Sequence, residues 1–201
     1  MSADRPSAMR MIAALGGFCL VAGLMLGITA YITRGPIEQA RIDNVNAAIA
    51  AVAPRFTNNP SADAVEVTRP DGHVITVYPA INADTLAGAA VESYSPDGFS
   101  GEIKVMYGFD SRGAVTGYRV LSHAETPGLG AKMTDWFASP EGSRTSVIGL
   151  DLTLRRAYVS KDGGDVDGIT AATISSRAFL DALRRAHEAF IEYRDTKYPE
   201  K

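Results

Sequence analysis

Residues 167–176 read Asp167-Gly168-Ile169-Thr170-Ala171-Ala172-Thr173-Ile174-Ser175-Ser176, a small and hydroxyl-rich segment that leads into an amphipathic sequence. The apolar residues of that sequence recur at helical spacing and form one stripe: Phe179, Leu183, Ala186 and Phe190. The pattern predicts a core-facing helix with Ser175 or Ser176 as its N-cap. Thr173 is then expected just outside the helix N-terminus, where free N–H groups and the helix dipole favour a phosphate group.

A second motif lies upstream, in the sequence Glu125-Thr126-Pro127-Gly128-Leu129-Gly130. Two glycines and a proline in so short a span force an irregular loop. Leu129 can cover a flat apolar ring, and the backbone beside Gly128 can approach a ligand closely. Glu125 and Thr126 offer a hydrogen-bond acceptor and a donor to polar ring edges. Taken alone, each motif also fits a plain role, the first as a capping segment and the second as a tight turn.

Together and in this order, the two motifs resemble those of the FMN-binding domain family. That family attaches FMN through a phosphoester bond to the second Thr of a (Ser/Thr)-Gly-Ala-Thr-x-(Ser/Thr) motif, which matches Thr173. The chain departs from the pattern at Ala171, where the family usually has Gly, and Ala lacks the backbone freedom of Gly. Lys161, in a turn sequence, can neutralise a phosphodiester or simply be solvated. The cofactor-binding residues expected beside Thr173 are Glu125, Thr126, Gly128, Leu129, Lys161, Asp167, Gly168, Thr170, Ala172 and Ser175.

The run from Met11 to Thr33 carries no charge and no proline, and it is long enough for one membrane span. Arg5 and Arg10 precede it, and this modest basic excess favours a cytoplasmic N-terminus. A cleaved signal peptide is the alternative, but the run is longer than a typical h-region and lacks a clean small-x-small cleavage site. The helical pattern continues through Pro36–Val52, which favours an uncleaved anchor.

The rest of the chain has an α+β pattern, with antiparallel strands flanked by helices. A strand within 101–109, a turn at 110–113 and a returning strand at 114–121 are the clearest elements. The remaining expectations are strands at 73–78 and 152–160, a short helix at 134–137, a connection at 60–71, an undetermined segment at 82–92 and a frayed tail after Tyr193. The expected parts are a cytoplasmic N-terminus (1–10), a transmembrane anchor (11–33), a membrane-proximal helix and connection (34–60) and an FMN-binding domain (61–201).

Composition and motifs argue against several functions. The 201 residues are 46% hydrophobic and 21% charged, which indicates a packed core, and the net charge of −3 comes without a basic stripe for nucleic acid. The single cysteine, Cys19, lies in the predicted span, and the three histidines show no metal-ligand spacing, so we expect neither an internal disulfide nor a metal site. Rossmann and hydrolase signatures are also missing from the sequence, and we expect no catalytic residue within this chain.

An N-terminal anchor followed by both motifs in this order resembles the G subunit of the Rnf electron transport complex. The resemblance implies a covalent FMN carrier in the bacterial inner membrane, with its domain on the periplasmic side. It also implies an ion-translocating ferredoxin:NAD oxidoreductase (a translocase), whose other subunits are partners, and a flavin transferase for maturation. Alternatives are the C subunit of a Na+-translocating NADH:quinone reductase, which is usually longer, a membrane-anchored FMN-domain sensor, and a structural membrane protein without flavin.

Overall fold

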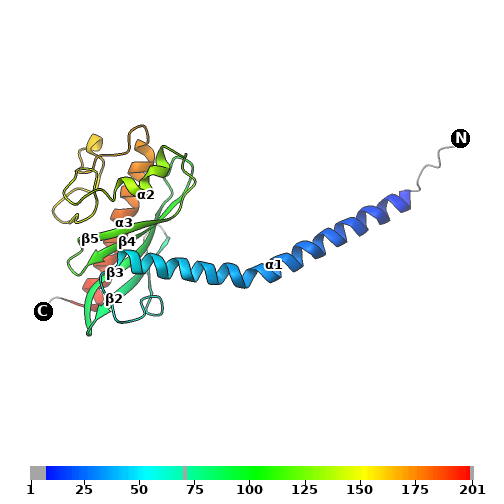
Figure 1. Ribbon diagram of the computed structural model, residues 1–201, viewed down its shortest axis with the longest axis horizontal. Coiled ribbons are helices and arrows are strands. Elements are labelled where there is room, and N and C mark those ends of the chain that lie inside the picture. The colour runs from blue at the N-terminus through cyan, green and yellow to red at the C-terminus, as the bar shows by residue number, and fades with distance from the viewer. Residues whose placement is uncertain (1–7, 70–71, 200–201) are drawn as a thin grey trace. The chain divides into compact units, whose positions relative to one another are not determined.

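The computed structural model describes residues 8–69 and 72–199, which fall into two compact units, Met1–Asn44 and Val45–Lys201. Five strands, three α-helices and two short 3-10 helices follow one another along these residues (Figure 1). Their order is α1 (Ala8–Val52), β1 (Val65–Thr68), β2 (Val74–Asn82), β3 (Thr85–Ser95), β4 (Ile103–Asp110), β5 (Val115–Ser122), η1 (Gly130–Lys132), α2 (Met133–Trp136), η2 (Ser160–Asp162) and α3 (Thr173–Lys197).

The first unit is the larger part of α1, which runs unbroken through Pro36 to Val52. The sequence predicted that the helix of residues 11–33 continues through Pro36–Val52, and the structure has this continuous helix. Large apolar side chains are exposed along its first half, as expected for a helix that faces lipid: Met11, Ile12, Leu15, Phe18, Leu20, Leu24, Leu26, Ile28 and Ile32. Among residues 8–69 and 72–199, α1 alone is long and apolar enough to cross a membrane, judged by length and composition.

The second unit is built on an antiparallel five-stranded sheet in the order β1-β2-β3-β4-β5, so each strand pairs with its neighbour in sequence. Strands were expected near the positions of β2, β4 and β5, and the structure confirms them. β3 occupies most of the undetermined segment, and β1 lies inside the expected connection, of which residues 70 and 71 are outside the described part. The α+β class is confirmed.

The strand expected at 152–160 is wrong. The residues between α2 and α3 are mostly turns, and one parallel bridge between Val159 and Val166 is all the pairing that 152–160 makes. Their N–H groups bond locally: Leu154 and Arg155 to the Asp151 carbonyl, at 3.2 and 3.0 Å. Four successive side chains from Thr153 to Arg156 are exposed, so the segment has no buried face to place on a sheet.

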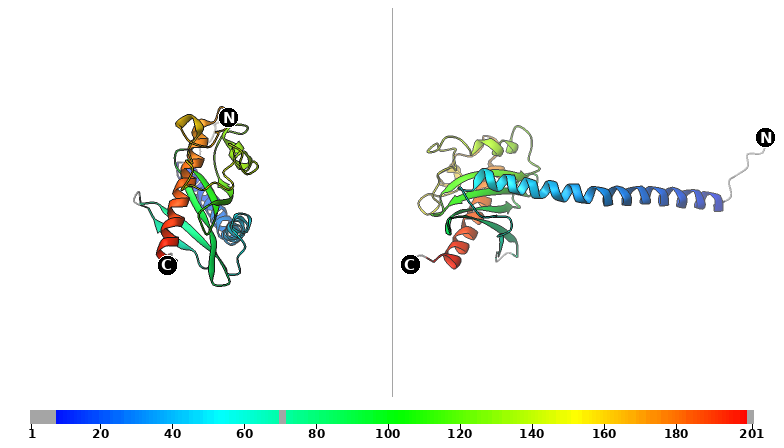
Figure 2. Two further views of the ribbon diagram at one scale, coloured as in Figure 1. Left: turned by 90° about the vertical axis from the view of Figure 1, so that its left-hand side faces the viewer. Right: turned by 60° about the horizontal axis from the view of Figure 1, so that its bottom comes forward.

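Helix α3 crosses one face of the sheet and buries its apolar stripe there (Figure 1 and Figure 2). Strand residues alternate between this face and the other. Val91 and Tyr107 pack toward α3, whereas Ala90 and Met106 pack against the last turns of α1, at Ala48, Ile49 and Val52. Burial raises the pKa of Tyr107, whose hydroxyl donates to the Phe179 carbonyl at 2.7 Å.

Both ends of α3 differ from the expectation. The helix begins at Thr173 with Ala172 as the N-cap, because both serines proposed as caps are engaged elsewhere. Ser175 donates to the Glu125 carboxylate, and Ser176 accepts from the Ile169 N–H and donates to the Ala172 carbonyl. At the other end, the helix continues to Lys197, past the expected fraying point. Thr173 is therefore the first helical residue rather than a residue outside the helix.

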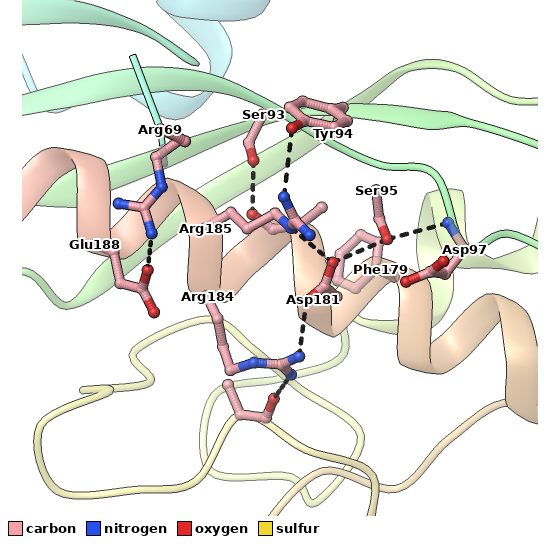
Figure 3. A network of polar contacts seen from close by, with 12 residues as sticks. Arg69, Ser93, Tyr94, Ser95, Asp97, Phe179, Asp181, Arg184, Arg185 and Glu188 are labelled. Atoms are coloured by element: carbon pink, nitrogen blue, oxygen red, sulfur yellow. Dashed lines mark hydrogen bonds and ion pairs between the residues drawn. The ribbon is translucent and has the colours of Figure 1, made fainter. Parts of the chain in front are cut away.

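A polar network fixes α3 to β3 (Figure 3). The Asp181 carboxylate accepts from Arg184 at 2.9 Å, from Arg185 at 2.8 Å and from the Ser95 hydroxyl at 3.0 Å. Earlier on the same strand, the Ser93 hydroxyl donates to the Ala182 carbonyl at 2.9 Å. These bonds hold the end of β3, and the loop that follows it, against the first half of α3.

Candidate functional site

Thr173 lies between two pockets at the N-terminus of α3. One, of about 310 Å³, is lined mainly by apolar side chains, and we call it the apolar pocket. The other, of about 220 Å³, contains a lysine, an aspartate and two hydroxyls besides Thr173, and we call it the polar pocket. Ala171 and Thr173 line both. Figure 2 shows the irregular segment before α3, in yellow and orange, beside this end of the helix.

The apolar pocket has three large apolar side chains that are substantially exposed. Phe99 is 67% exposed, Leu129 42% and Ile174 46%, although each lies within a folded domain with a well-filled core. They come from three different segments, the β3–β4 loop, the loop after β5 and the first turn of α3. Exposed apolar groups gathered around one pocket indicate a surface that an apolar ligand covers.

Glu125 joins the segments that form this pocket. Its side chain is only 5% exposed, and its carboxylate accepts from the Ser175 hydroxyl at 2.5 Å and from the Ser100 N–H at 3.1 Å. One bond reaches the first turn of α3, and the other reaches the loop that carries Phe99. A buried carboxylate with two donors is stable, and it holds both donors in place. Glu125 was expected to meet a ring edge directly, and in the structure it lines the pocket while bonding to its walls.

The glycines of the loop after β5 allow the backbone conformation that places Leu129 at the pocket. Gly128 has φ of +78°, a conformation that side chains rarely adopt, and the Leu129 N–H closes the turn onto the Thr126 carbonyl at 3.2 Å. A Cβ on Gly130 would come within 2.3 Å of the Ser175 hydroxyl, so the loop can pack on α3 only with glycine there. Thr126 lies exposed at the pocket rim. The predicted irregular loop is confirmed, and its leucine lines the pocket.

The polar pocket brings together the other expected residues. Lys161, Asp167, Gly168 and Thr170 line it beside Thr173. Lys161 is exposed in η2, where its ammonium group can approach an anion from solvent. No side chain caps α3 within the described residues, so the first N–H groups of the helix face the same region with the positive end of the dipole.

Asp167 mainly fixes the start of the Thr173 motif. Its N–H donates to the Arg144 carbonyl at 2.6 Å, its carbonyl accepts from the Trp136 indole at 3.1 Å, and its carboxylate pairs with Arg144 at 3.4 Å. Gly168 then passes close to the helix, since a Cβ there would lie 3.2 Å from the Ser176 hydroxyl. Asp167 and Gly168 therefore shape the approach to Thr173.

Ala171 has φ of +62°, in the left-handed region where Gly is usual. It is the position at which the sequence departs from the flavin-attachment motif. The backbone keeps the conformation that a glycine would adopt easily, and the methyl group costs about 1–2 kcal/mol of local strain. Ala171 thus adopts a backbone conformation that a glycine would adopt at lower cost.

A third pocket, of about 400 Å³, lies on the other side of Ile174. Its guanidinium groups are already paired, Arg177 with Asp162 at 2.6 Å and Arg184 with Asp181, and Arg184 also covers the Tyr158 ring at 3.9 Å. The bond to Arg177 lowers the pKa of Asp162. These contacts tie the segment before the motif to α3. Its size alone does not make it the binding site, because its arginines and aspartates pair with one another.

Two large apolar residues of the apolar pocket, Phe99 and Ile174, were not predicted from the sequence. Phe99 stands in Asp-Gly-Phe-Ser-Gly, so a large apolar residue again lies between two glycines, as Leu129 does. That similarity was a usable signal. Ile174 looked like an ordinary residue of a hydroxyl-rich run. No cluster of three or more metal-ligating side chains occurs in the part of the chain that the structure describes.

Fold and site together define an FMN-domain protein with one apolar N-terminal helix. The family model described as an FMN-binding domain matches residues 98–188, which include the loop of Phe99 and both motifs. The G subunit of the ion-translocating oxidoreductase complex of Vibrio parahaemolyticus serotype O3:K6 (strain RIMD 2210633) is 34% identical over 186 residues, covering 88% of this chain and 86% of the relative. The chain belongs to this family of G subunits.

Other proteins with the same name are also similar to this chain. The protein of Cereibacter sphaeroides (strain ATCC 17023) is 33% identical over 186 residues, with 90% of this chain and 83% of the relative covered. That of Aliivibrio fischeri (strain MJ11) is 47% identical over a shorter match of 104 residues, which covers 50% of this chain and 48% of the relative.

Proposed function

We propose that this chain is the covalently flavinylated electron-carrier subunit of a membrane-bound, ion-translocating ferredoxin:NAD oxidoreductase complex. The relatives are named as G subunits of ion-translocating oxidoreductase complexes, which favours this function over the C subunit of an NADH:quinone reductase or an anchored sensor. The observation that carries the proposal is the position of Thr173, which lines a polar pocket and an apolar pocket at once.

The two pockets fit the two ends of FMN, which is a phosphate joined to a flat aromatic ring system. Lys161 and the uncapped N-terminus of α3 supply positive potential for the phosphate. Phe99, Leu129 and Ile174 supply apolar surface for the ring. When bound, the flavin provides the redox chemistry, and the protein positions it and sets its surroundings.

Attachment requires one phosphoryl transfer to Thr173. A bond forms between its Oγ and phosphorus, the bond from phosphorus to the leaving group of an activated flavin phosphate breaks, and the hydroxyl proton is removed. A flavin transferase supplies both the activated donor and the base. Thr173 is only partly buried, so its hydroxyl is accessible to such an enzyme.

The test is to produce the full chain with a flavin transferase and examine the denatured protein for flavin fluorescence in a gel. Thr173→Ala should lose the fluorescence and the added mass entirely. Thr170→Ala is the matched control, because it changes the exposed hydroxyl in the same pocket, and it should keep at least part of the flavin. Full flavinylation of Thr173→Ala would refute the assignment.

We also propose an inner-membrane location with the FMN domain on the periplasmic side. Support comes from the apolar helix and from Arg5 and Arg10 before it. A covalent tether also suits a cofactor that is hard to replace outside the cytoplasm. A reporter that is active only after export, fused after residue 40, should be active, whereas activity of a cytoplasm-only reporter at that site would reverse the orientation.

A further inference from the structure

Phe99 is the most exposed aromatic side chain among the described residues of the second unit, at 67%. Four other phenylalanines of this unit, Phe109, Phe137, Phe179 and Phe190, are fully buried in the core. Phe99 contributes nothing to that core, so packing within the folded domain does not explain its size and aromatic character. It lines the apolar pocket together with Leu129 and Thr173.

The β3–β4 loop that carries Phe99 is held on both sides of this residue. Before it, the Ser95 hydroxyl donates to Asp181 at 3.0 Å, in the network of Figure 3. Within it, directly after Phe99, the Ser100 N–H donates to Glu125 at 3.1 Å. A Cβ on Gly98 would lie 2.2 Å from the Gly101 carbonyl oxygen and 2.7 Å from the Glu125 carboxylate, so the loop is tightly closed. Phe99 is therefore exposed on a loop that is anchored rather than loose.

From this arrangement we infer that Phe99 packs against the isoalloxazine ring of the flavin, as the aromatic wall of its pocket, and that Glu125 is the residue that positions it. The inference rests on the proposed function, since it needs the flavin at Thr173. Aromatic rings stack favourably on flat conjugated systems, and the apolar side chain excludes water from the ring. Charge gained by the ring on reduction is then less well solvated, which makes reduction harder.

The wall is built from two chemically different contacts. Leu129 and Ile174 offer aliphatic surface, whereas Phe99 offers a π face. Glu125 links the supports of both sides, because it bonds to Ser100 beside Phe99 and to Ser175 beside Ile174. Replacing Phe99 should change the surroundings of the ring without touching the attachment residue.

The experiment introduces tryptophan as a quencher at two positions of the full, flavinylated chain. Phe99→Trp places an indole against the ring, and native flavin fluorescence should fall several-fold relative to the parent. Leu154→Trp is the matched control, since Leu154 is 82% exposed and lines none of the three pockets described. The control should leave the fluorescence unchanged. Equal native fluorescence in the two variants would overturn the inference.

Attachment is measured separately, by flavin fluorescence of the denatured protein in a gel. Missing flavin in the parent would count against the proposed function, whereas attached flavin without quenching in Phe99→Trp would count against Phe99 alone. A second variant, Phe99→Ala, should admit water and raise the flavin midpoint potential in a reductive titration. Since Phe99 is exposed, neither variant removes core packing. An unchanged potential would mean that Phe99 serves to contact a partner protein instead, which also overturns the inference.

Discussion

The two sides of Thr173 offer a ligand different kinds of interaction, electrostatic on one side and apolar on the other. On one side, Lys161 and the N-terminus of α3 present charge and N–H groups that remain accessible to water. On the other, Phe99 and Leu129 present apolar surface on anchored loops. Exposed charge attracts an anion but is screened by salt, whereas an apolar wall acts at contact and is sensitive to shape. The polar side should therefore tolerate single substitutions better than the apolar side.

The largest effect on stability is expected on the apolar side, at Glu125, which joins two segments that form the apolar pocket. Glu125→Ala leaves the Ser175 hydroxyl and the Ser100 N–H without their acceptor, and each such bond to a charged group contributes about 1.5–3 kcal/mol. We expect a loss of about 3 kcal/mol in the free energy of unfolding, measured by denaturant titration in detergent, together with poorer flavin attachment. Glu102→Ala is the control, because Glu102 is exposed and pairs only with Lys104, at 3.5 Å, among the described residues. Equal stability of the two variants would contradict the bridging role.

Leu129→Asp should have the next largest effect, confined to the apolar side. The new carboxylate would lie against the ring, where losing water is costly for a charge. We expect flavin to remain attached at Thr173 with an altered absorption spectrum and a shifted potential, measured by reductive titration. Leu154→Asp provides a control at an exposed leucine outside the pocket. If Leu129→Asp leaves both the spectrum and the potential unchanged, the loop is merely a turn.

Lys161→Ala should have the smallest effect, because an exposed charge contributes only about 0–1 kcal/mol. We expect attachment to slow several-fold at low salt and the difference from the parent to shrink as salt is raised. The measurement is the time course of flavinylation at two salt concentrations. Lys132→Ala, an exposed lysine outside the polar pocket, should leave the rate unchanged. If Lys161→Ala abolished flavin attachment as completely as Thr173→Ala, the polar side would not tolerate single substitutions.

The sequence predicted the elements whose signals are local. Alternation identified β4, and the turn after it identified the returning strand β5. Helical spacing identified the buried stripe of α3 through Phe179 and Phe190. The small-residue segment of β3 lacked such a signal, because Ala89 and Ala90 are buried on opposite faces and break the contrast between buried and exposed positions. The start of α3 was misplaced, because Ser175 bonds to a residue 50 positions away that no local rule reveals.

For the site, the residues named by local sequence were easier to predict than the way in which the fold brings distant segments together. Thr173, Leu129 and Lys161 were all named from motifs, and the structure places them around adjoining pockets. Phe99 was missed because its local sequence alone does not mark it as a pocket residue. It lines the apolar pocket because the Ser100 N–H beside it bonds to Glu125, which holds the β3–β4 loop there. The sequence did not predict the conformation of Ala171, whose φ of +62° lies in the left-handed region that glycine favours.

The two faces of the sheet are covered by segments that lie far apart in the sequence, the end of α1 and α3, and this sets an order on folding during synthesis. The Val52 carbonyl accepts from the Thr116 hydroxyl at 2.6 Å, 64 residues further on. The partner of Ser93 is Ala182, which is synthesised 89 residues later. At about 5–20 residues per second of translation, the first pair is separated by roughly 3–13 s of synthesis. Because the pocket around Thr173 needs the first turn of α3, it cannot form before α3 has been synthesised.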